Sequence, residues 1–193
     1  MWWYQLWSII KEKNDISLKW RNKNYHFPCI TLHQQIKSYN SLAMIFDSEK
    51  LDSQKILLKL LNDNNKIIYY SDLCLSWKEI MSLSKNDLIT IGSHTHNHLN
   101  LALLNRGELS YEIDYSIKLL ESKINKKVQH ISYPFGSKKD INEHVISEVR
   151  NCNNINTAVT TLTRPITNNN LFALPRIHIK NYFSDILHLK ISG

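Results

Sequence analysis

The chain has 193 residues, of which 42% are hydrophobic, and its net charge is +7. This length and hydrophobic content fit one folded domain of ordinary size and exclude a disordered chain. The basic residues form no run with interleaved aromatic side chains, so we expect a solvated basic surface and no nucleic-acid partner.

The start of the chain predicts an amphipathic helix, because Trp3, Leu6, Trp7 and Ile10 lie at helical spacing. We expect its apolar face to pack on the rest of the protein. A helix of ten residues covers about 15 Å, against a hydrocarbon core of about 30 Å, so it is too short to span a membrane. The alternative to packing is that its aromatic face docks on a membrane interface, and we favour packing, so membrane association is not expected. The segment also lacks the basic start and the cleavage site of a signal peptide. The widely spaced cysteines form no CxxC pair, which argues against a disulfide framework and favours the cytoplasm.

Residues 14–50 show only weak periodicity, and no element is predicted there. A helix is predicted for residues 53–61. Four aliphatic residues define its expected buried side: Ile56, Leu57, Leu60 and Leu61. A short strand is predicted at 67–70. The Ser-x-x-Glu pattern that begins at Ser76 is a capping box, so the next helix is expected to start at Trp77.

From residue 88 onward, short strand-like segments alternate with amphipathic helices. The predicted strands cover residues 88–93, 128–133, 155–161 and 171–179, and the predicted helices cover residues 107–126, 141–152 and 182–189. The helix at 107–126 has the clearest signal, since aliphatic residues recur in it every three or four positions. Strands that alternate with helices predict a parallel sheet with helical crossovers, which is an α/β layer or barrel. The pattern contains no repeat and no domain boundary.

Three histidines, His94, His96 and His98, follow the predicted strand 88–93 directly. In a turn that enters a helix, residues four apart share a face with Cβ atoms about 5–6 Å apart, so His94 and His98 can bind one metal ion. On a strand, His94 and His96 would share a face instead. Gly92 favours the turn, and His96 is then a supporting or simply packed residue. A hydrolytic zinc site has three protein ligands and an open water position, so a third ligand is required. The alternative is a group of surface histidines that holds no metal.

Tyr133, Pro134, Phe135 and Gly136 end the predicted strand 128–133. In α/β folds the functional site lies at the carboxyl ends of the strands, so we expect this segment and the histidines on one rim. The turn leaves the Phe135 N–H to point into a cleft, where it can stabilise a developing oxyanion. Taken alone, the same four residues also fit an ordinary turn.

Five segments resemble, in order and spacing, the polysaccharide deacetylases of the NodB homology type, carbohydrate esterase family 4. They are residues 75–79, 91–101, 131–136, 157–161 and 173–177. The resemblance implies an irregular (β/α) barrel, here incomplete. It also implies metal-dependent removal of acetyl groups from N-acetylated, or O-acetylated, sugars of a polysaccharide, so that an N-acetylated glycan is the implied partner.

By this resemblance, His94 and His98 match the His-Ser/Thr-x-x-His motif, whose histidines bind zinc or a similar divalent ion. The motif Arg-x-Pro-Tyr/Phe-Gly falls on residues 132–136, with Ser132 in place of its arginine. Phe135 would supply the oxyanion amide. The implied substrate contacts of this motif are Tyr133 and Pro134.

Arg176 would be a polar member of the catalytic cleft, because it lies in a Leu-Pro-Arg-Ile segment similar to that of the family. A general-acid histidine is usual near the end of the fold. The candidates for this role are His178 and His188, although neither lies in a clean match to the family's motif.

The largest departure concerns the family's first motif, Thr-Phe-Asp-Asp, which supplies the catalytic base and the third metal ligand. No Asp-Asp pair occurs in the sequence, and the similar segment 45–47 is followed by Ser48 in place of the second Asp. A (β/α) barrel typically needs about 250 residues. We therefore expect one deacetylase-like domain over residues 1–193 that lacks an amino-terminal portion, with a variable helical segment at 1–75 and the motifs at 76–193. Its activity alone is expected to be low, and the alternative is a non-catalytic carbohydrate-binding remnant.

Overall fold

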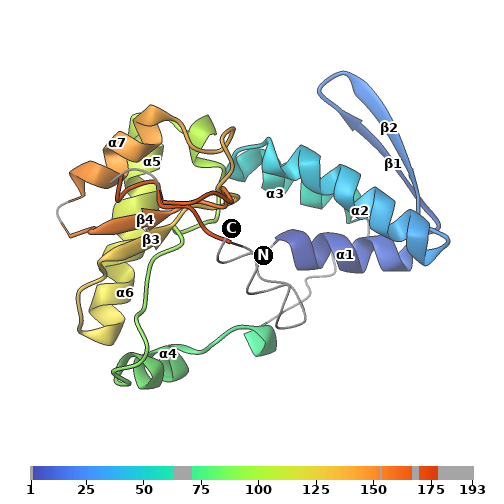
Figure 1. Ribbon diagram of the computed structural model, residues 1–193. Helices are drawn as coiled ribbons and strands as arrows, with labels where there is room; N and C mark the ends of the chain where they lie inside the picture. The colour runs from blue at the N-terminus through green and yellow to red at the C-terminus, as the bar shows by residue number, and fades with distance from the viewer. Residues whose placement is uncertain (1, 63–70, 153, 167–169, 178–193) are drawn as a thin grey trace, which may run out of the picture. The chain divides into compact units, whose positions relative to one another are not determined.

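The computed structural model describes residues 2–62, 71–152, 154–166 and 170–177 (Figure 1). Two compact units are present, Met1–Ile89 and Thr90–Gly193. The single domain expected for the chain stays a prediction. Several predictions lie outside the described residues: the strand 67–70, the helix 182–189, and the general-acid candidates His178 and His188.

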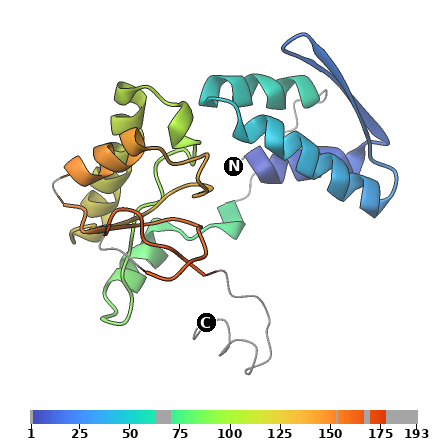
Figure 2. The same ribbon diagram turned by 45° about the horizontal axis from the view of Figure 1, so that its top comes forward.

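The first unit combines helices with a β-hairpin (Figure 2). Its elements are α1 (Trp2–Glu12), β1 (Asp15–Trp20), β2 (Lys23–Pro28), α2 (Leu32–Asp47), α3 (Leu51–Leu61), the 3₁₀ turn η1 (Ser71–Leu73) and α4 (Trp77–Ser84). The amphipathic helix predicted at the start of the chain is confirmed as α1. Its residues Leu6, Ile9 and Ile10 are buried, and α1 contacts α2 and α3. No helix in the described part of the chain combines the length and the hydropathy needed to cross a bilayer.

Sequence reasoning misses the hairpin of β1 and β2, which lies in the weakly patterned segment 14–50. The strands pair antiparallel across a turn in which Arg21 and Asn22 have φ of 46° and 62°. Positive φ at both central residues is the geometry of a type I′ turn, for which Asn-Gly is the usual sequence signal. Alternation does support the first strand, because Ile16 and Leu18 are buried between exposed neighbours.

The position of α3 is confirmed, but its buried face is only partly as predicted. Leu57 and Leu61 are buried, whereas Ile56 and Leu60 are 52% and 53% exposed. The prediction is therefore wrong for the latter two. Gln54 shares the buried face instead, because its side-chain amide donates to the main-chain carbonyls of two residues at the end of α2 and just beyond it. An amide with buried hydrogen-bond partners can replace an aliphatic side chain in this way.

The capping box of α4 is confirmed. The Ser76 hydroxyl accepts from the Glu79 N–H at 3.3 Å, and the Glu79 carboxylate accepts from the Ser76 N–H at 2.7 Å. The Ser76 hydroxyl also donates to the Glu79 carboxylate at 2.7 Å, and this bond, together with that from the Ser76 N–H, lowers the pKa of Glu79. The helix begins at Trp77, as expected.

Truncation of Leu57 is expected to destabilise the first unit, since this side chain is fully buried. The variant Leu57→Ala should lower the free energy of unfolding by about 2–5 kcal/mol, because it leaves a cavity in the core. The matched control is Leu60→Ala on the same helix, which should change it by less than about 0.5 kcal/mol. Urea unfolding followed by circular dichroism measures both, and equal losses in the two variants would contradict the assigned buried face.

The second unit alternates helices with short strands (Figure 1). Its elements are the 3₁₀ turn η2 (Leu101–Leu103), α5 (Arg106–Ser110), the π-helical turn η3 (Tyr111–Tyr115), α6 (Ser116–Ile124), β3 (His130–Ser132), α7 (Glu143–Asn151) and β4 (Thr157–Val159). The helix predicted at 107–126 is confirmed as the continuous run of α5, η3 and α6, and that at 141–152 as α7. The strands predicted at 128–133 and 155–161 are confirmed but shorter.

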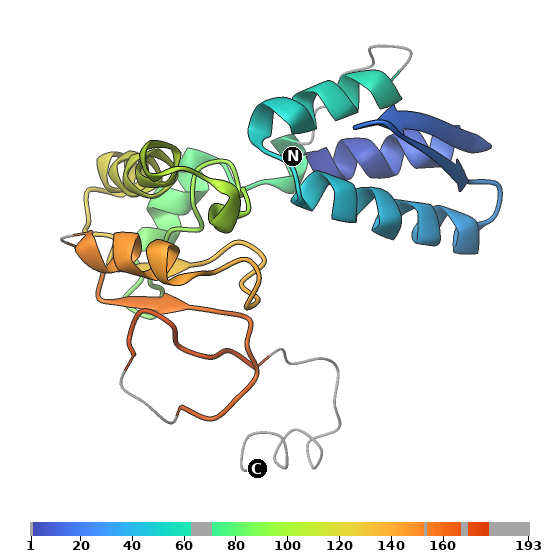
Figure 3. The same ribbon diagram turned by 90° about the horizontal axis from the view of Figure 1, so that it is seen from above.

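The ladder of this unit is parallel, as expected. Strand β3 pairs with β4, and single parallel bridges join Ser93 to Ile131 and Val159 to Leu174. Helix α7 connects β3 to β4 and lies beside this strand pair (Figure 3), which is the arrangement of a helical crossover between parallel strands. The residues that the structure describes form no closed barrel, in agreement with the incomplete (β/α) barrel expected.

The strands predicted at 88–93 and 171–179 are reduced, within the described residues, to the bridging residues Ser93 and Leu174. The first begins as a turn instead, because the Leu88 N–H donates to the side chain of Asn86 at 2.9 Å. Leu88 is 94% exposed. The apolar side chain of Leu88 predicted a buried strand, but the chain lies on the surface at this residue.

Candidate functional site

The histidine segment 94–98 forms a loop that follows the bridging residue Ser93. His94 and His98 come together as expected, with ring centroids 4.8 Å apart and ring planes at 79°. The loop is not the helical turn that the sequence predicts, because Thr95 and His98 have φ of 65° and 56°. The two imidazoles therefore pair on a loop with left-handed backbone at these two positions, and not on a helical turn.

A hydrogen bond fixes the tautomer of His94. Its Nδ1 lies 2.6 Å from the main-chain oxygen of Ser132. A carbonyl oxygen only accepts, so Nδ1 carries the proton and Nε2 carries the lone pair. Ligating histidines typically donate their other ring N–H to a carboxylate, a backbone carbonyl or water in this manner. In the neutral imidazole of His94, Nε2 is therefore the nitrogen with the lone pair that metal coordination requires.

His98 is kept neutral by its surroundings. Burial lowers the pKa of its imidazole, and the adjacent His94 lowers it further. The ring of Phe135 packs against the His98 ring, with 5.0 Å between the centroids. Because a metal ion binds the neutral imidazole, a lowered pKa favours the ligand form of His98 near neutral pH.

Acidification is expected to destabilise the second unit through His98. Its folded pKa lies below the ordinary value of 6.5, so the unfolded chain binds the proton first as the pH falls. This effect is absent well above pH 6.5, and stability is lost as the pH falls through and below that value. Urea unfolding across this pH range should show a weaker pH dependence for His98→Gln than for the parent chain. Identical pH dependence in the two proteins would contradict the lowered pKa.

His96 does not join the pair. Its ring packs edge-on against Tyr115 and Tyr111, at centroid distances of 4.5 and 5.9 Å. The two tyrosines are stacked on one another, and all three side chains are exposed. His96 is thus packed on the π-helical turn η3, which is one of the two roles expected for it.

Residues 133–136 form a tight turn at the end of β3. The Gly136 N–H donates to the Pro134 carbonyl at 2.5 Å and closes a γ-turn around Phe135. Phe135 and Gly136 have φ of 57° and 71°. Thr161, just after β4, holds the turn, since its Oγ1 donates to the Phe135 carbonyl at 2.8 Å. Left-handed backbone at a residue other than glycine is uncommon and is often found at functional sites.

The main chain of this turn fits its predicted role better than the side chains do. Among the described residues, the Phe135 N–H has no hydrogen-bond acceptor, so it is available to an external oxygen. Tyr133 is 1% exposed, its hydroxyl donates to the Phe172 carbonyl at 2.8 Å, and burial raises its pKa. Pro134 is buried as well. Both side chains are thus buried, and the substrate contacts expected of Tyr133 and Pro134 stay a prediction.

Arg176 reaches the site from the segment after Leu174. Its Nη1 donates to the Ser132 hydroxyl at 3.2 Å. Ser132 is also the residue whose carbonyl oxygen lies beside His94 Nδ1. The motif that the turn resembles has an arginine in place of Ser132, and here Arg176 brings a guanidinium to that residue.

Two buried carboxylates near the histidine loop, Glu112 and Asp140, are missed by sequence reasoning. They are 2% and 3% exposed. Asp140 connects the chain just after the histidine loop to the chain just after the Phe135 turn. It accepts from the Asn100 side chain at 2.9 Å and from the Ser137 N–H at 3.1 Å. Glu112 accepts from the loop backbone. One signal was available in the sequence: a carboxylate beside Ile113 on the apolar side of a helix must be buried with donors.

The described residues fit part of a metal site. No group of three or more His, Cys, Asp or Glu side chains among them is arranged to hold a metal ion. The pair of His94 and His98 has the ligand chemistry of two such positions. Asp47, in the segment most similar to the family's first motif, lies at the end of α2 and not on a strand. The described residues therefore supply two candidate metal ligands, and no third ligand is found among them.

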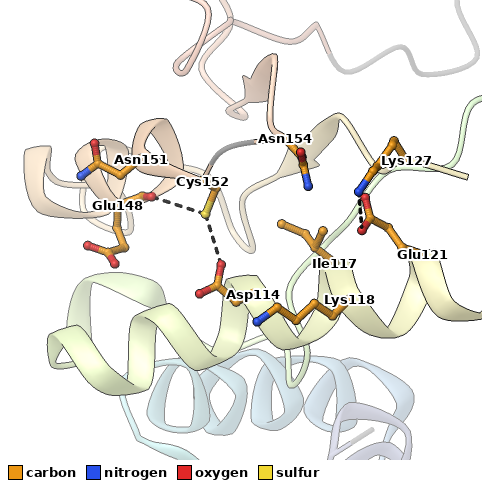
Figure 4. Close-up of a pocket in the computed structure, with 9 residues that line it drawn as sticks. All are labelled: Asp114, Ile117, Lys118, Glu121, Lys127, Glu148, Asn151, Cys152 and Asn154. Carbon is orange, nitrogen blue, oxygen red and sulfur yellow. Dashed lines mark hydrogen bonds and ion pairs between the residues drawn. The ribbon is translucent and has the colours of Figure 1, made fainter.

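A cavity of about 490 Å³ lies elsewhere, next to α6 and the end of α7 (Figure 4). Lys127 and Cys152 on its wall precede β3 and β4, so it adjoins the amino ends of the strands, whereas ligands in such folds bind at the carboxyl ends. The Cys152 thiol donates to Asp114 at 3.4 Å. Burial and the carboxylates of Asp114 and Glu148 raise its pKa to about 12. A protonated thiol is no nucleophile, and we do not assign the site to this cavity.

The geometry thus defines a (β/α) protein with a histidine pair and a tight turn around Phe135 at the carboxyl ends of parallel strands. The family model described as polysaccharide deacetylase matches residues 35–154, and the chain belongs to this family. The resemblance found in the sequence is therefore confirmed.

Solved structures of similar fold agree with this membership. The deacetylase PplD of Streptococcus pyogenes, solved in complex with acetate, has a TM-score of 0.52 at 24% identity, covering 60% of this chain and 50% of that one. BC0361, a polysaccharide deacetylase from Bacillus cereus, has a TM-score of 0.54 at 21% identity, covering 75% and 49%. The chain spans about half the length of these structures. A comparison with curated proteins finds no match.

Proposed function

We propose that this chain carries the metal-binding and oxyanion part of a polysaccharide deacetylase active site. The reaction is hydrolysis of acetyl groups on N-acetylated sugars of a glycan, with O-acetylated sugars as the close alternative. The observation that carries the proposal is the pairing of His94 and His98 beside the Phe135 turn. The family match supports the class of reaction.

Each part of the site has a role that follows from its chemistry. His94 and His98 would hold a divalent ion, with zinc as the first candidate, and the Ser132 carbonyl keeps His94 in its ligand tautomer. Such an ion, when bound, polarises a carbonyl and lowers the pKa of a bound water. The Phe135 N–H donates to the acetyl oxygen as that oxygen gains negative charge. Arg176 adds positive charge beside Ser132.

The chain as it stands is expected to hydrolyse acetyl groups slowly. The resemblance assigns the catalytic base and the third metal ligand to an Asp-Asp pair, which the sequence does not contain. Loss of a general base typically costs about 10²–10⁴-fold in rate. His178 remains the candidate for the acid that protonates the leaving amine.

The same absence of an Asp-Asp pair favours a second candidate function. In this alternative, the chain binds N-acetylated glycans through the cleft but does not hydrolyse them. Both candidates predict glycan binding, and only the first predicts release of acetate.

Acetate release therefore decides between the two. The chain is incubated with zinc and an N-acetylglucosamine oligomer, and acetate is compared with that from His98→Ala and from a zinc-free sample. A deacetylase site predicts slow release that needs zinc and is lost in His98→Ala. Oligomer binding without acetate favours the second candidate. Release that is equal in His98→Ala, or neither release nor binding, would contradict the proposed function.

A further inference from the structure

We propose that Glu112 is a positioning residue that holds the histidine loop in the shape required for metal binding. The inference rests on the proposed function, since it concerns how the pair His94 and His98 is brought together. Glu112 lies in the π-helical turn η3 and is 2% exposed. Its carboxylate acts on the backbone between the two histidines, because it accepts hydrogen bonds from His96 and Asn97.

The carboxylate of Glu112 is bonded to the middle of the loop. Its Oε2 accepts from the His96 N–H at 3.1 Å and from the Asn97 N–H at 2.7 Å. Its Oε1 accepts from the Asn97 side-chain amide at 2.6 Å. The main-chain oxygen of Glu112 also accepts from the His96 N–H, at 3.1 Å. Two successive peptide groups, between His94 and His98, are therefore tied to one side chain.

These bonds restrain the part of the loop whose backbone is unusual. Thr95 and His98, which flank the bonded residues, have φ of 65° and 56°. Residues other than glycine stay in the left-handed region only where their surroundings over-determine the conformation. Buried hydrogen bonds to a charged acceptor are shorter and stronger than bonds between neutral groups. Glu112 can thus hold a loop that would otherwise relax and separate the two imidazoles.

The same helical run supports the loop at a second point. The Ser116 hydroxyl lies 2.7 Å from the Ser93 hydroxyl and donates to the Ile113 carbonyl at 2.8 Å. The Ser93 hydroxyl in turn accepts from the Thr95 N–H at 3.2 Å. One continuous helix therefore fixes both the start and the middle of the loop. The π-helical turn, a feature often found at functional sites, carries the residue that fixes the middle.

Glutamine is the sharpest substitution at this position. It has the shape of glutamate, but one of its two terminal atoms is an amide donor. It cannot accept from the loop at both terminal atoms, and the hydrogen bonds that remain lose the strength that a charged acceptor gives them. We expect Glu112→Gln to bind zinc about 10- to 100-fold more weakly, the usual cost of losing a group that supports the ligands.

The experiment is zinc titration by calorimetry on the parent chain, Glu112→Gln, Glu108→Gln and His98→Ala, at a temperature where thermal unfolding shows each variant folded. Glu108→Gln is the matched control, because it is the same change in the same helical run at a residue that caps α5 through Asn105. It should bind zinc as the parent chain does.

The outcomes separate this inference from the proposed function. Weaker binding in Glu112→Gln and unchanged binding in Glu108→Gln support it. Parent-like affinity in Glu112→Gln, with affinity lost in His98→Ala, overturns it and leaves the metal site standing. Unchanged affinity in His98→Ala overturns the metal site itself. If Glu112→Gln does not fold, Asn97→Ala replaces it, since this change removes only the amide bond to Oε1. Asn97→Ala should then bind zinc more weakly, and parent-like affinity would overturn the inference.

Discussion

Replacing His98 with alanine is expected to abolish measurable zinc binding by this chain. His98 and His94 face each other at 4.8 Å between ring centroids, the Ser132 carbonyl lies beside Nδ1 of His94, and the lowered pKa of His98 favours its neutral form. Losing a direct ligand should cost more than the loss of a supporting group, and thus more than about 100-fold in affinity. Zinc titration by calorimetry near neutral pH measures the change, and His94→Ala should behave in the same way.

The matched control is His96→Ala, which removes an imidazole from the same loop. His96 packs against Tyr115 and Tyr111 and takes no part in the pair. Its removal should leave zinc affinity within about twofold of the parent chain. Equal losses in His96→Ala and His98→Ala would mean that the histidine string chelates zinc without a defined geometry, against the present account.

The variant Gly136→Ala is expected to disrupt the turn that presents the Phe135 N–H. Gly136 has φ of +71°, and a Cβ added to it would lie 2.8 Å from the Thr161 main-chain nitrogen. The left-handed conformation alone costs a residue other than glycine about 1–3 kcal/mol, and the close backbone contact forces the turn away from β4. We expect a loss of at least about 2 kcal/mol in the free energy of unfolding, together with slower acetate release.

Gly107→Ala is the control for this change. Gly107 lies in α5, and an added Cβ would meet its nearest atom at 3.5 Å, an ordinary van der Waals distance. Because alanine restricts the unfolded chain more than glycine does, this variant should be neutral or up to about 1 kcal/mol more stable. Urea unfolding measures both variants. A Gly136→Ala protein as stable as Gly107→Ala would refute the tight packing of the turn.

Local patterns predicted the helices at 107–126 and 141–152 correctly, because each of them buries one apolar face. Leu109, Ile113 and Ile117 recur at helical spacing and are all buried. The hairpin of the first unit was missed because its sequence lacks a clear local pattern. Its turn uses Arg21 and Asn22, which give no clear turn signal, and β2 buries only Phe27.

The pair of His94 and His98 was predicted, but on a helical turn that the structure does not contain. The pairing depends on left-handed backbone at Thr95 and on buried acceptors such as Glu112, which lie far along the chain. Such long-range hydrogen bonds leave no periodic signal in the sequence. The burial of Tyr133 likewise depends on contacts that local patterns do not show, such as its hydrogen bond to the Phe172 carbonyl.

The central claim is that His94 and His98 together bind a divalent metal ion, and X-ray absorption at the zinc edge tests it most directly. The chain loaded with one equivalent of zinc should show nitrogen neighbours at about 2.0–2.1 Å with the scattering pattern of two imidazoles. The pattern should drop to that of one imidazole, or zinc should be lost, in His98→Ala. Sulfur neighbours at about 2.3 Å, the distance of a cysteine ligand, or an unchanged imidazole pattern in His98→Ala would contradict the account.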